Sequence, residues 1–175
     1  MISVLGLDLG TTWGWARVTV TDFHDDRWVW TWGEEAAPMA ELGFSSPGLL
    51  FANFARWLQG ELPNTDAVTW EQVPFATGKG GNYIKGQEAL LLAHLGTTPG
   101  VHWQPYDVQA LKTFATGRGN ASKASMIDTI PDAWRTRFHG AKDWDGRTRL
   151  TDNQADALWV TLMMVEHMLA LRVGK

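Results

Sequence analysis

Three acidic side chains stand at positions in the sequence where an uncompensated charge would be costly. Asp8 ends an apolar run within GLDLG, Glu71 lies inside the apolar stretch VTWEQV, and Asp156 opens the apolar part of DNQADALWV. A buried carboxylate needs a hydrogen-bonding partner, a proton or a metal ion. If the three segments pack together, their oxygen atoms form the kind of site that Mg²⁺ or Mn²⁺ prefers. A pair of such ions can support hydrolysis of a phosphodiester.

Each of these carboxylates also has a purely structural explanation. Asp8 could cap a turn through Gly10, and Glu71 could pair with an arginine. Asp152 or Asp156 could be an acid at a helix N-terminus, which the helix dipole favours. Three acids at the ends of core elements are, taken together, harder to explain by coincidence, so metal binding is the stronger hypothesis.

The elements that would position these acids follow from the spacing of apolar residues. Short apolar or alternating runs predict strands at residues 2–9, 13–20, 27–33, 66–73 and 101–106. Helical spacing predicts helices at residues 47–62, 82–94, 108–115, from about Ala121, and 152–172. A flexible loop is expected at residues 78–81 and an irregular, polar segment at residues 131–150. This order predicts one α/β domain, residues 1–175, with a mixed sheet.

A series of sequence blocks resembles, in order, the RuvC-type Holliday junction resolvases. The blocks are VLGLDLG (4–10) with WGWA (13–16), WEQV (70–73), IKGQEA (84–89), VQALKTFATG (108–117), NASKASM (120–126) and DNQADAL (152–158). Their order and similar spacing cover nearly the whole chain. The resemblance implies an RNase H-like fold of the α/β class, in which helices flank a mixed β-sheet within a single domain.

The resemblance also implies roles for particular residues. Asp8, Glu71 and Asp156 fall on the family's catalytic, metal-binding acids. The family often has its fourth ligand three residues before the last acid, where this chain has Asn153, and Asp152 stands one residue earlier. Both positions share a helical face with Asp156, and we favour Asp152 because a carboxylate is the stronger ligand.

Basic residues of the second half of the chain are the expected contacts to DNA. Lys123 matches a family lysine near the scissile phosphate and is expected to act in catalysis by stabilising transition-state charge. The expected DNA-binding residues are Lys79, Lys85, Lys112, Arg118 and Lys123. Ordinary solvated surface is the alternative for each. Phe75 stands one residue beyond a family aromatic that acts as a wedge at the junction centre, although a core phenylalanine would explain it as well.

The distribution of charge permits a phosphate-binding face. The net charge of −4 argues weakly against a nucleic-acid-binding protein. Residues 1–75, however, hold 3 basic and 10 acidic side chains, whereas residues 76–175 hold 12 basic and 9 acidic ones. An asymmetry of this kind allows a local basic face on an acidic protein, and an ordinary surface would explain it equally well.

Composition limits the remaining possibilities. No stretch approaches the roughly 18 apolar residues of a membrane span, and no basic region precedes the N-terminal apolar run. We therefore expect a cytoplasmic protein without a membrane partner. The absence of cysteine excludes a thiolate metal site. Most of the 11 tryptophans fall on strand or helix faces, which favours core packing over base stacking.

The expected function is cleavage of four-way DNA junctions by a homodimer that uses Mg²⁺ or Mn²⁺, with two ions in each active site. As the resemblance implies, paired nicks would leave 5′-phosphate and 3′-hydroxyl ends. One alternative keeps the fold and changes the substrate to another branched DNA or an RNA/DNA hybrid. A second is a junction-binding protein whose metal site is impaired at Asn153.

A third alternative is an ATPase. The segment DLGTT, beginning at Asp8, also resembles the phosphate loop of the sugar kinase and actin superfamily. Those proteins use two RNase H-like lobes and are about twice as long, and the chain has no second loop of that type. The ATPase hypothesis is therefore the weakest of the four.

Overall fold

The computed structural model describes residues 1–21, 28–36, 47–73, 78–131 and 151–173, and its centre is a five-stranded mixed sheet in the order β3-β2-β1-β4-β5. The strands are β1 (Ile2–Asp8), β2 (Thr12–Val20), β3 (Trp28–Ala36), β4 (Ala67–Gln72) and β5 (His102–Asp107). The first three form an antiparallel meander, and β4 and β5 run parallel to β1. All five predicted strands are confirmed.

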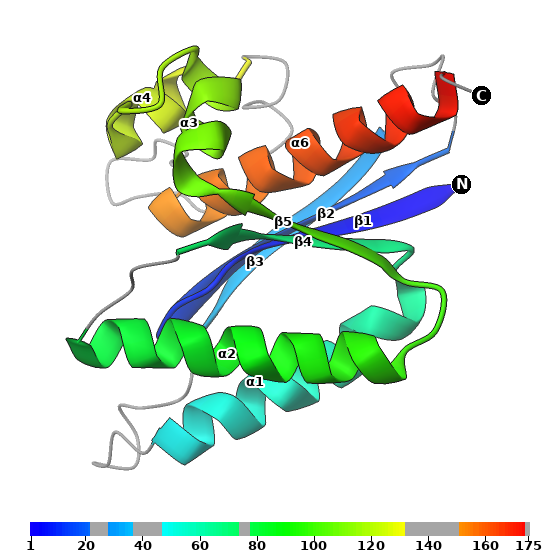
Figure 1. Ribbon diagram of the computed structural model, residues 1–175, viewed down its shortest axis with the longest axis vertical. Coiled ribbons are helices and arrows are strands. Elements are labelled where there is room, and N and C mark those ends of the chain that lie inside the picture. The colour runs from blue at the N-terminus through cyan, green and yellow to red at the C-terminus, as the bar shows by residue number, and fades with distance from the viewer. Residues whose placement is uncertain (22–27, 37–46, 74–77, 132–150, 174–175) are drawn as a thin grey trace, which may run out of the picture.

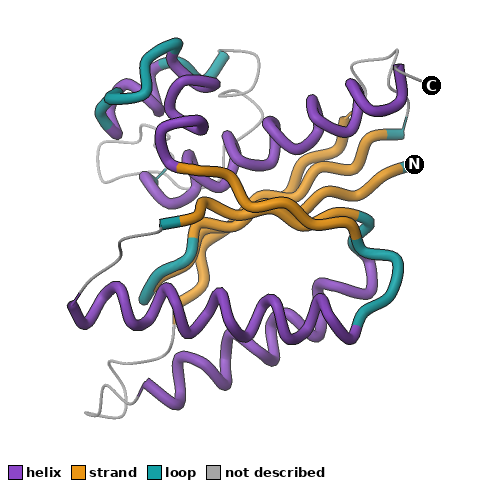
Figure 2. Tube along the Cα trace, in the orientation of Figure 1, coloured by secondary structure: helices purple, strands orange, loops and turns teal. Residues whose placement is uncertain are grey.

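Helices cover both faces of the sheet (Figures 1 and 2). On one face lie α1 (Pro47–Glu61), the 3₁₀ turn η1 (Leu62–Asn64) and α2 (Gly78–Thr97). On the other lies α6 (Asp152–Val173), with α3 (Val108–Thr116) and α4 (Lys123–Asp128) beside its N-terminal half. The predicted α/β architecture with a mixed sheet between helices is confirmed. Within the described ranges, no helix is long and apolar enough to cross a membrane.

The structure corrects two helix boundaries. The loop predicted at residues 78–81 was wrong, because α2 begins at Gly78 and includes all four residues. Packing of α2 against α1, with Gly81 itself buried, and the apolar cluster that α2 shares with the sheet outweigh the low helix propensity of glycine. The helix expected from about Ala121 begins at Lys123, since the Ser122 hydroxyl caps it by accepting the Ser125 N–H. Residues 132–150 of the predicted irregular segment lie outside the described residues.

Two apolar clusters, one on each face, hold the helices to the sheet. Val4 of β1 belongs to the cluster under α6, and Leu5 and Leu7 belong to the one under α1 and α2. This alternation is the period of an extended strand. The tryptophans that were expected in the core all pack in or against the clusters: Trp13, Trp15, Trp28, Trp30, Trp32, Trp57 and Trp159.

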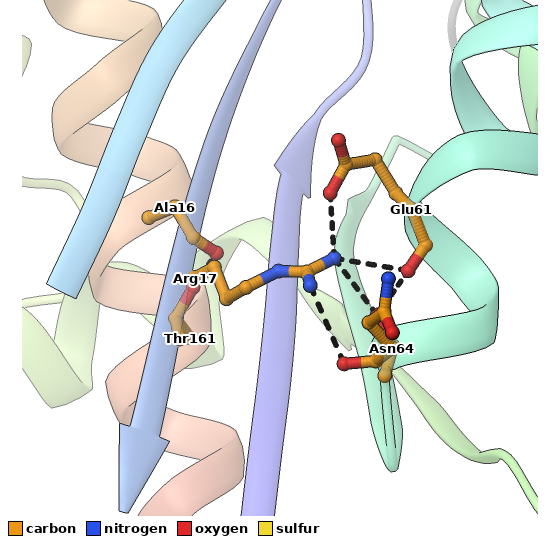
Figure 3. A network of polar contacts seen from close by, with 6 residues as sticks. Ala16, Arg17, Glu61, Asn64 and Thr161 are labelled. Atoms are coloured by element: carbon orange, nitrogen blue, oxygen red, sulfur yellow. Dashed lines mark hydrogen bonds and ion pairs between the residues drawn. The ribbon is translucent and has the colours of Figure 1, made fainter. Parts of the chain in front are cut away.

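An arginine joins the end of α1 to the sheet (Figure 3). The Arg17 guanidinium of β2 donates to the carboxylate of Glu61 at 2.6 Å and to its carbonyl oxygen at 3.0 Å. It also donates to the Thr65 hydroxyl at 3.0 Å and to the Asn64 carbonyl at 3.3 Å. These bonds satisfy carbonyl groups that the end of a helix leaves without partners. They fix α1 and η1 on the face of the sheet opposite α6.

Candidate active site

Asp8 and Glu71 lie side by side at the carboxyl ends of two adjacent parallel strands. The last pair in register between β1 and β4 is Leu7 with Trp70, and the two acids are the next residues. Leu7 and Trp70 pack into the cluster under α1 and α2. Side chains alternate along a strand, so both carboxylates point to the opposite face, which α6 covers.

Helix α6 brings Asp156 to the same place because two glycines let it approach the sheet closely. A Cβ on Gly14 would overlap the backbone carbonyl of Asn153, and a Cβ on Gly6 would lie 2.7 Å from the Ala157 carbonyl oxygen. Gly14 is also the register partner of Asp8. The first turns of α6, which carry Asp156, therefore rest directly beside Asp8.

The three carboxylates interact electrostatically. Burial, followed by the charges of Glu71 and Asp156, raises the pKa of Asp8 well above its usual range. Burial, followed by the charge of Asp156, raises the pKa of Glu71 to about 7. Burial also raises the pKa of Asp156. Lys123 opposes all three shifts, and Lys112 opposes those of Glu71 and Asp156. The two lysines thus offset only part of the repulsion.

The chemistry of these donors fits a divalent cation. All three side chains are carboxylates, which suits Mg²⁺ or Mn²⁺, and a bound cation would offset the negative charge that, together with burial, raises their pKa values. The side chains of these acids, as they are oriented in the structure, fit one shared ion less well than their chemistry does. Among the described residues, no group of three or more His, Cys, Asp or Glu side chains is arranged to hold one ion together. An ion shared by Asp8, Glu71 and Asp156 would therefore require rotation of their side chains.

The raised pKa values predict how the stability of the metal-free protein depends on pH. Between pH 4.5 and about 7, the folded protein retains a proton on Glu71 that the unfolded chain has lost. The folded state then binds more protons, so the free energy of unfolding should fall as pH rises through this window. Chemical unfolding in EDTA would measure this trend, and Glu71→Gln should make it shallower, while the raised pKa values of Asp8 and Asp156 account for the remainder. A stability that rises over this window in the parent would contradict the prediction.

The two candidates for a fourth ligand have different surroundings. Asp152 is half exposed and forms an ion pair with Lys123 at 3.6 Å. Its charge raises the pKa of Asp156, which places the two carboxylates near each other. The Asn153 amide instead donates to the Thr12 carbonyl of β2 at 3.5 Å. Asn153 thus takes part in the packing of α6 on the sheet.

A small pocket of about 100 Å³ opens beside the acids. It is lined by Glu71, Val108, Leu111, Lys112, Lys123, Met126 and Asp156. Lys112 comes from α3 and Lys123 from α4, so two helices bring cations to a pocket whose other charged groups are carboxylates. Such a pocket can hold a phosphate group between the cations and the acids.

Two other predicted DNA contacts, Lys85 and Arg118, do not line this pocket. Arg118 is exposed in the turn after α3, and Lys85 is exposed on α2, which lies on the opposite face of the sheet. Phe75 and the side chain of Lys79 lie outside the described part of the structure.

One acid near the site was missed in the sequence. Glu34 of β3 is the register partner of Gly14, and its carboxylate accepts a hydrogen bond from the Thr151 hydroxyl. Its charge contributes to the raised pKa of Asp8. The available signals were an acid within the alternating β3 segment and the sequence TDNQ (151–154), in which Thr151 and Gln154 have the spacing of a helix-capping box.

The fold is that of RuvC. A solved structure of Thermus thermophilus RuvC matches 99% of this chain and 97% of its own, with 20% sequence identity and a TM-score of 0.62. T. thermophilus RuvC in complex with Holliday junction substrate matches over the same shares, also at 20% identity, with a TM-score of 0.63. No family model and no curated protein sequence matches the chain. The expected RuvC-type, RNase H-like fold is confirmed.

Proposed function

We propose that this protein is a metal-dependent endonuclease that resolves four-way DNA junctions, with residues 1–175 forming one nuclease domain. The observation that carries the proposal is the convergence of Asp8, Glu71 and Asp156 on one face of a RuvC-type sheet, next to a pocket that contains two lysines. Oxygen donors beside a cationic pocket suit a reaction in which negative charge develops on a phosphate.

Each charged residue of the site has a proposed role. Asp8, Glu71 and Asp156 would hold two Mg²⁺ or Mn²⁺ ions, with Asp152 in preference to Asn153 as the fourth ligand. When bound, the metal supplies an activated water and stabilises the leaving oxygen. Lys123 would contact the scissile phosphate and stabilise its developing charge. Cleavage of the strand would leave 5′-phosphate and 3′-hydroxyl ends.

The proposed substrate is a four-way junction bound by a homodimer. One of the matching structures is a RuvC bound to a Holliday junction, which supports this substrate class for a chain of the same fold. A two-fold symmetric dimer would present two active sites to two symmetric strands. Within that complex, Lys79, Lys85, Lys112 and Arg118 would contact phosphates, and Phe75 would act as a wedge.

Cleavage of matched DNA substrates tests this proposal. A four-way junction, a linear duplex of the same sequence and an RNA/DNA hybrid would be incubated with Mg²⁺, with Mn²⁺ and with EDTA. We expect metal-dependent, symmetric pairs of nicks in the junction, made within one binding event as a dimer requires. Faster cleavage of the hybrid or of a different branched DNA would favour the alternative substrate. Binding without nicks in either metal would favour the non-enzymatic alternative.

The two lysines of the pocket, Lys112 and Lys123, should contribute to cleavage because they lie beside the acids. Lys123→Ala and Lys112→Ala each remove a cation beside the acids, and we expect cleavage to fall about tenfold or more. The salt dependence of junction binding should also weaken by about one phosphate contact in each variant. Arg56→Ala is the matched control, because Arg56 is an exposed cation on α1, on the opposite face of the sheet, and its loss should leave cleavage at the parental rate. Parental cleavage and parental salt dependence in both pocket variants would assign the two lysines to ordinary surface.

A further inference from the structure

The first turn of α6 begins with a closed capping arrangement. The Thr151 hydroxyl accepts the backbone N–H of Gln154 at 3.2 Å, and the side-chain oxygen of Gln154 accepts the backbone N–H of Thr151 at 3.2 Å. The Thr151 carbonyl accepts the N–H of Ala155 at 3.0 Å. These bonds satisfy backbone groups at the start of the helix. They leave the proton of the Thr151 hydroxyl free to be donated elsewhere.

That proton goes to Glu34. The Thr151 hydroxyl donates to the Glu34 carboxylate, across 117 positions of sequence. Glu34 lies on β3 opposite Gly14, and Gly14 lies on β2 opposite Asp8, so all three belong to one row across the sheet. The bond therefore joins the start of α6 to the row of the sheet that contains Asp8.

The other described polar contacts of this turn are weak. Asn153 donates to the Thr12 carbonyl at 3.5 Å, which is the limit of a hydrogen bond. Asp152 and Lys123 are separated by 3.6 Å with both side chains at least half exposed, and an ion pair of that kind stabilises little. The bond from Thr151 to Glu34 is exposed to solvent as well, but it is a direct hydrogen bond to a charged acceptor, which makes it the strongest of these attachments.

A carboxylate at position 34 carries an electrostatic cost. Its charge adds to the repulsion on Asp8, in a part of the protein that already holds three carboxylates. A neutral residue at this position would avoid that repulsion. The hydrogen bond to Thr151 supplies a reason for a carboxylate here, because an ionised group is the acceptor that holds a hydroxyl most firmly.

We propose that Glu34 is a positioning residue that holds the first turn of α6 through Thr151 and thereby sets the position of Asp156 relative to Asp8. The role in cleavage rests on the function proposed above. In this role Glu34 acts through Thr151, whose hydroxyl donates to its carboxylate. A displacement of this turn by about 1 Å would move Asp156 and can lower the rate of a positioned reaction by up to about 100-fold.

Hydrogen exchange tests the proposal without any cleavage assay. In Glu34→Ala, the amides of Gln154 and Ala155 should exchange about fivefold faster, as expected for loss of one such bond at a helix end. Amides near Val165, far along α6, should be unchanged. Glu34→Gln keeps a side-chain acceptor without the charge and should restore part of the protection. Glu35→Ala is the matched control, because Glu35 follows on the same strand and points to the opposite face.

Metal binding and cleavage then test the consequence for the site. Calorimetry should show weaker Mn²⁺ binding to Glu34→Ala, and single-turnover junction cleavage at saturating metal should fall about 10- to 100-fold. Thr151→Ser retains both the cap and the donor and should match the parent, whereas Thr151→Val removes the cap as well as the bond to Glu34 and should lose at least as much as Glu34→Ala. The double variant Glu34→Ala/Thr151→Val should lose no more than the Thr151→Val variant alone, since both changes remove the same bond.

The outcomes separate the possible explanations. If Glu34→Gln loses as much as Glu34→Ala, or if the losses of the double variant add, Glu34 acts by its charge and the positioning role is wrong. Parental exchange and parental metal binding in Glu34→Ala would also overturn it. A parent protein that cuts no junction would refute the proposed function, while the exchange comparison would still decide whether Glu34 positions α6.

Discussion

Asp8→Asn, Glu71→Gln and Asp156→Asn should each lower the rate of junction cleavage about 10³-fold or more, while binding of the junction in EDTA persists. Each substitution keeps the shape of the side chain and removes a negative charge and a strong oxygen ligand. The metal acts mainly on charge that develops in the transition state, so the loss should appear in the cleavage step. Binding without metal should tighten slightly, because a negative charge that faces the phosphates is gone.

The same variants distinguish a metal site from a structural role by their stability. Burial and neighbouring negative charges raise the pKa values of all three acids, so the folded protein is destabilised by their ionisation. At pH 8 in EDTA, removal of one charge should therefore leave the melting temperature equal to the parent's or raise it. A carboxylate with a structural role would instead cause a loss of stability when replaced. Thermal melts must accompany the cleavage measurements for this reason.

Three further variants complete this experiment. Glu166→Gln is the matched control, because Glu166 is an exposed acid farther along α6. This variant should cleave junctions at the parental rate. Asp152→Asn and Asn153→Ala compare the two candidates for the fourth ligand, and the true ligand should show the larger loss of cleavage. If Asp8→Asn folds normally and nicks junctions at the parental rate, Asp8 is not a metal ligand of a catalytic site.

The sequence was sufficient for those features that depend on local periodicity. The alternation in 13–20 and the apolar run before Asp8 define strands because each side of the sheet must be apolar. Local periodicity carries no information about which strands become neighbours. The predicted metal site therefore depended on the assumption that the segments of Asp8 and Glu71 pack together. The parallel pairing of β1 with β4 fulfils this condition.

Features that depend on how distant elements pack were not predictable in this way. Glu34 looks like any polar residue of an alternating strand, and its importance depends on the register of β3 with β2 and on the place where α6 begins. The helical start of α2 depends on packing against α1, which overrides the preference of a glycine run for a loop. Likewise, the separation of Lys85 from the acids depends on which face α2 covers.

The close approach of α6 to β1 leads to the second large effect. At Gly6, a Cβ would lie 2.7 Å from the carbonyl oxygen of Ala157 and 2.9 Å from the backbone nitrogen of Thr161. Real Cβ atoms do not come so close to backbone atoms, so the helix or the strand must move. Overpacking of a core commonly costs about 1–3 kcal/mol, and the cost is higher where backbone must shift. Gly6→Ala should therefore destabilise the fold by about 3 kcal/mol or more.

Because α6 also carries Asp156, the Gly6→Ala protein that remains folded should cleave junctions poorly. Gly60→Ala is the matched control, since nothing lies within 4 Å of a Cβ there and alanine is the better helix former in α1. The Thr161 hydroxyl, which donates to the Ala16 and Ala157 carbonyls, also lies near Gly6 and could itself be the obstacle. Unfolding measurements of Gly6→Ala in a Thr161→Ala background separate the two causes. The loss of stability caused by Gly6→Ala should persist in that background, because the backbone contacts remain. If the loss disappears, a movable side chain, rather than the helix backbone, limits the approach of α6 to the sheet.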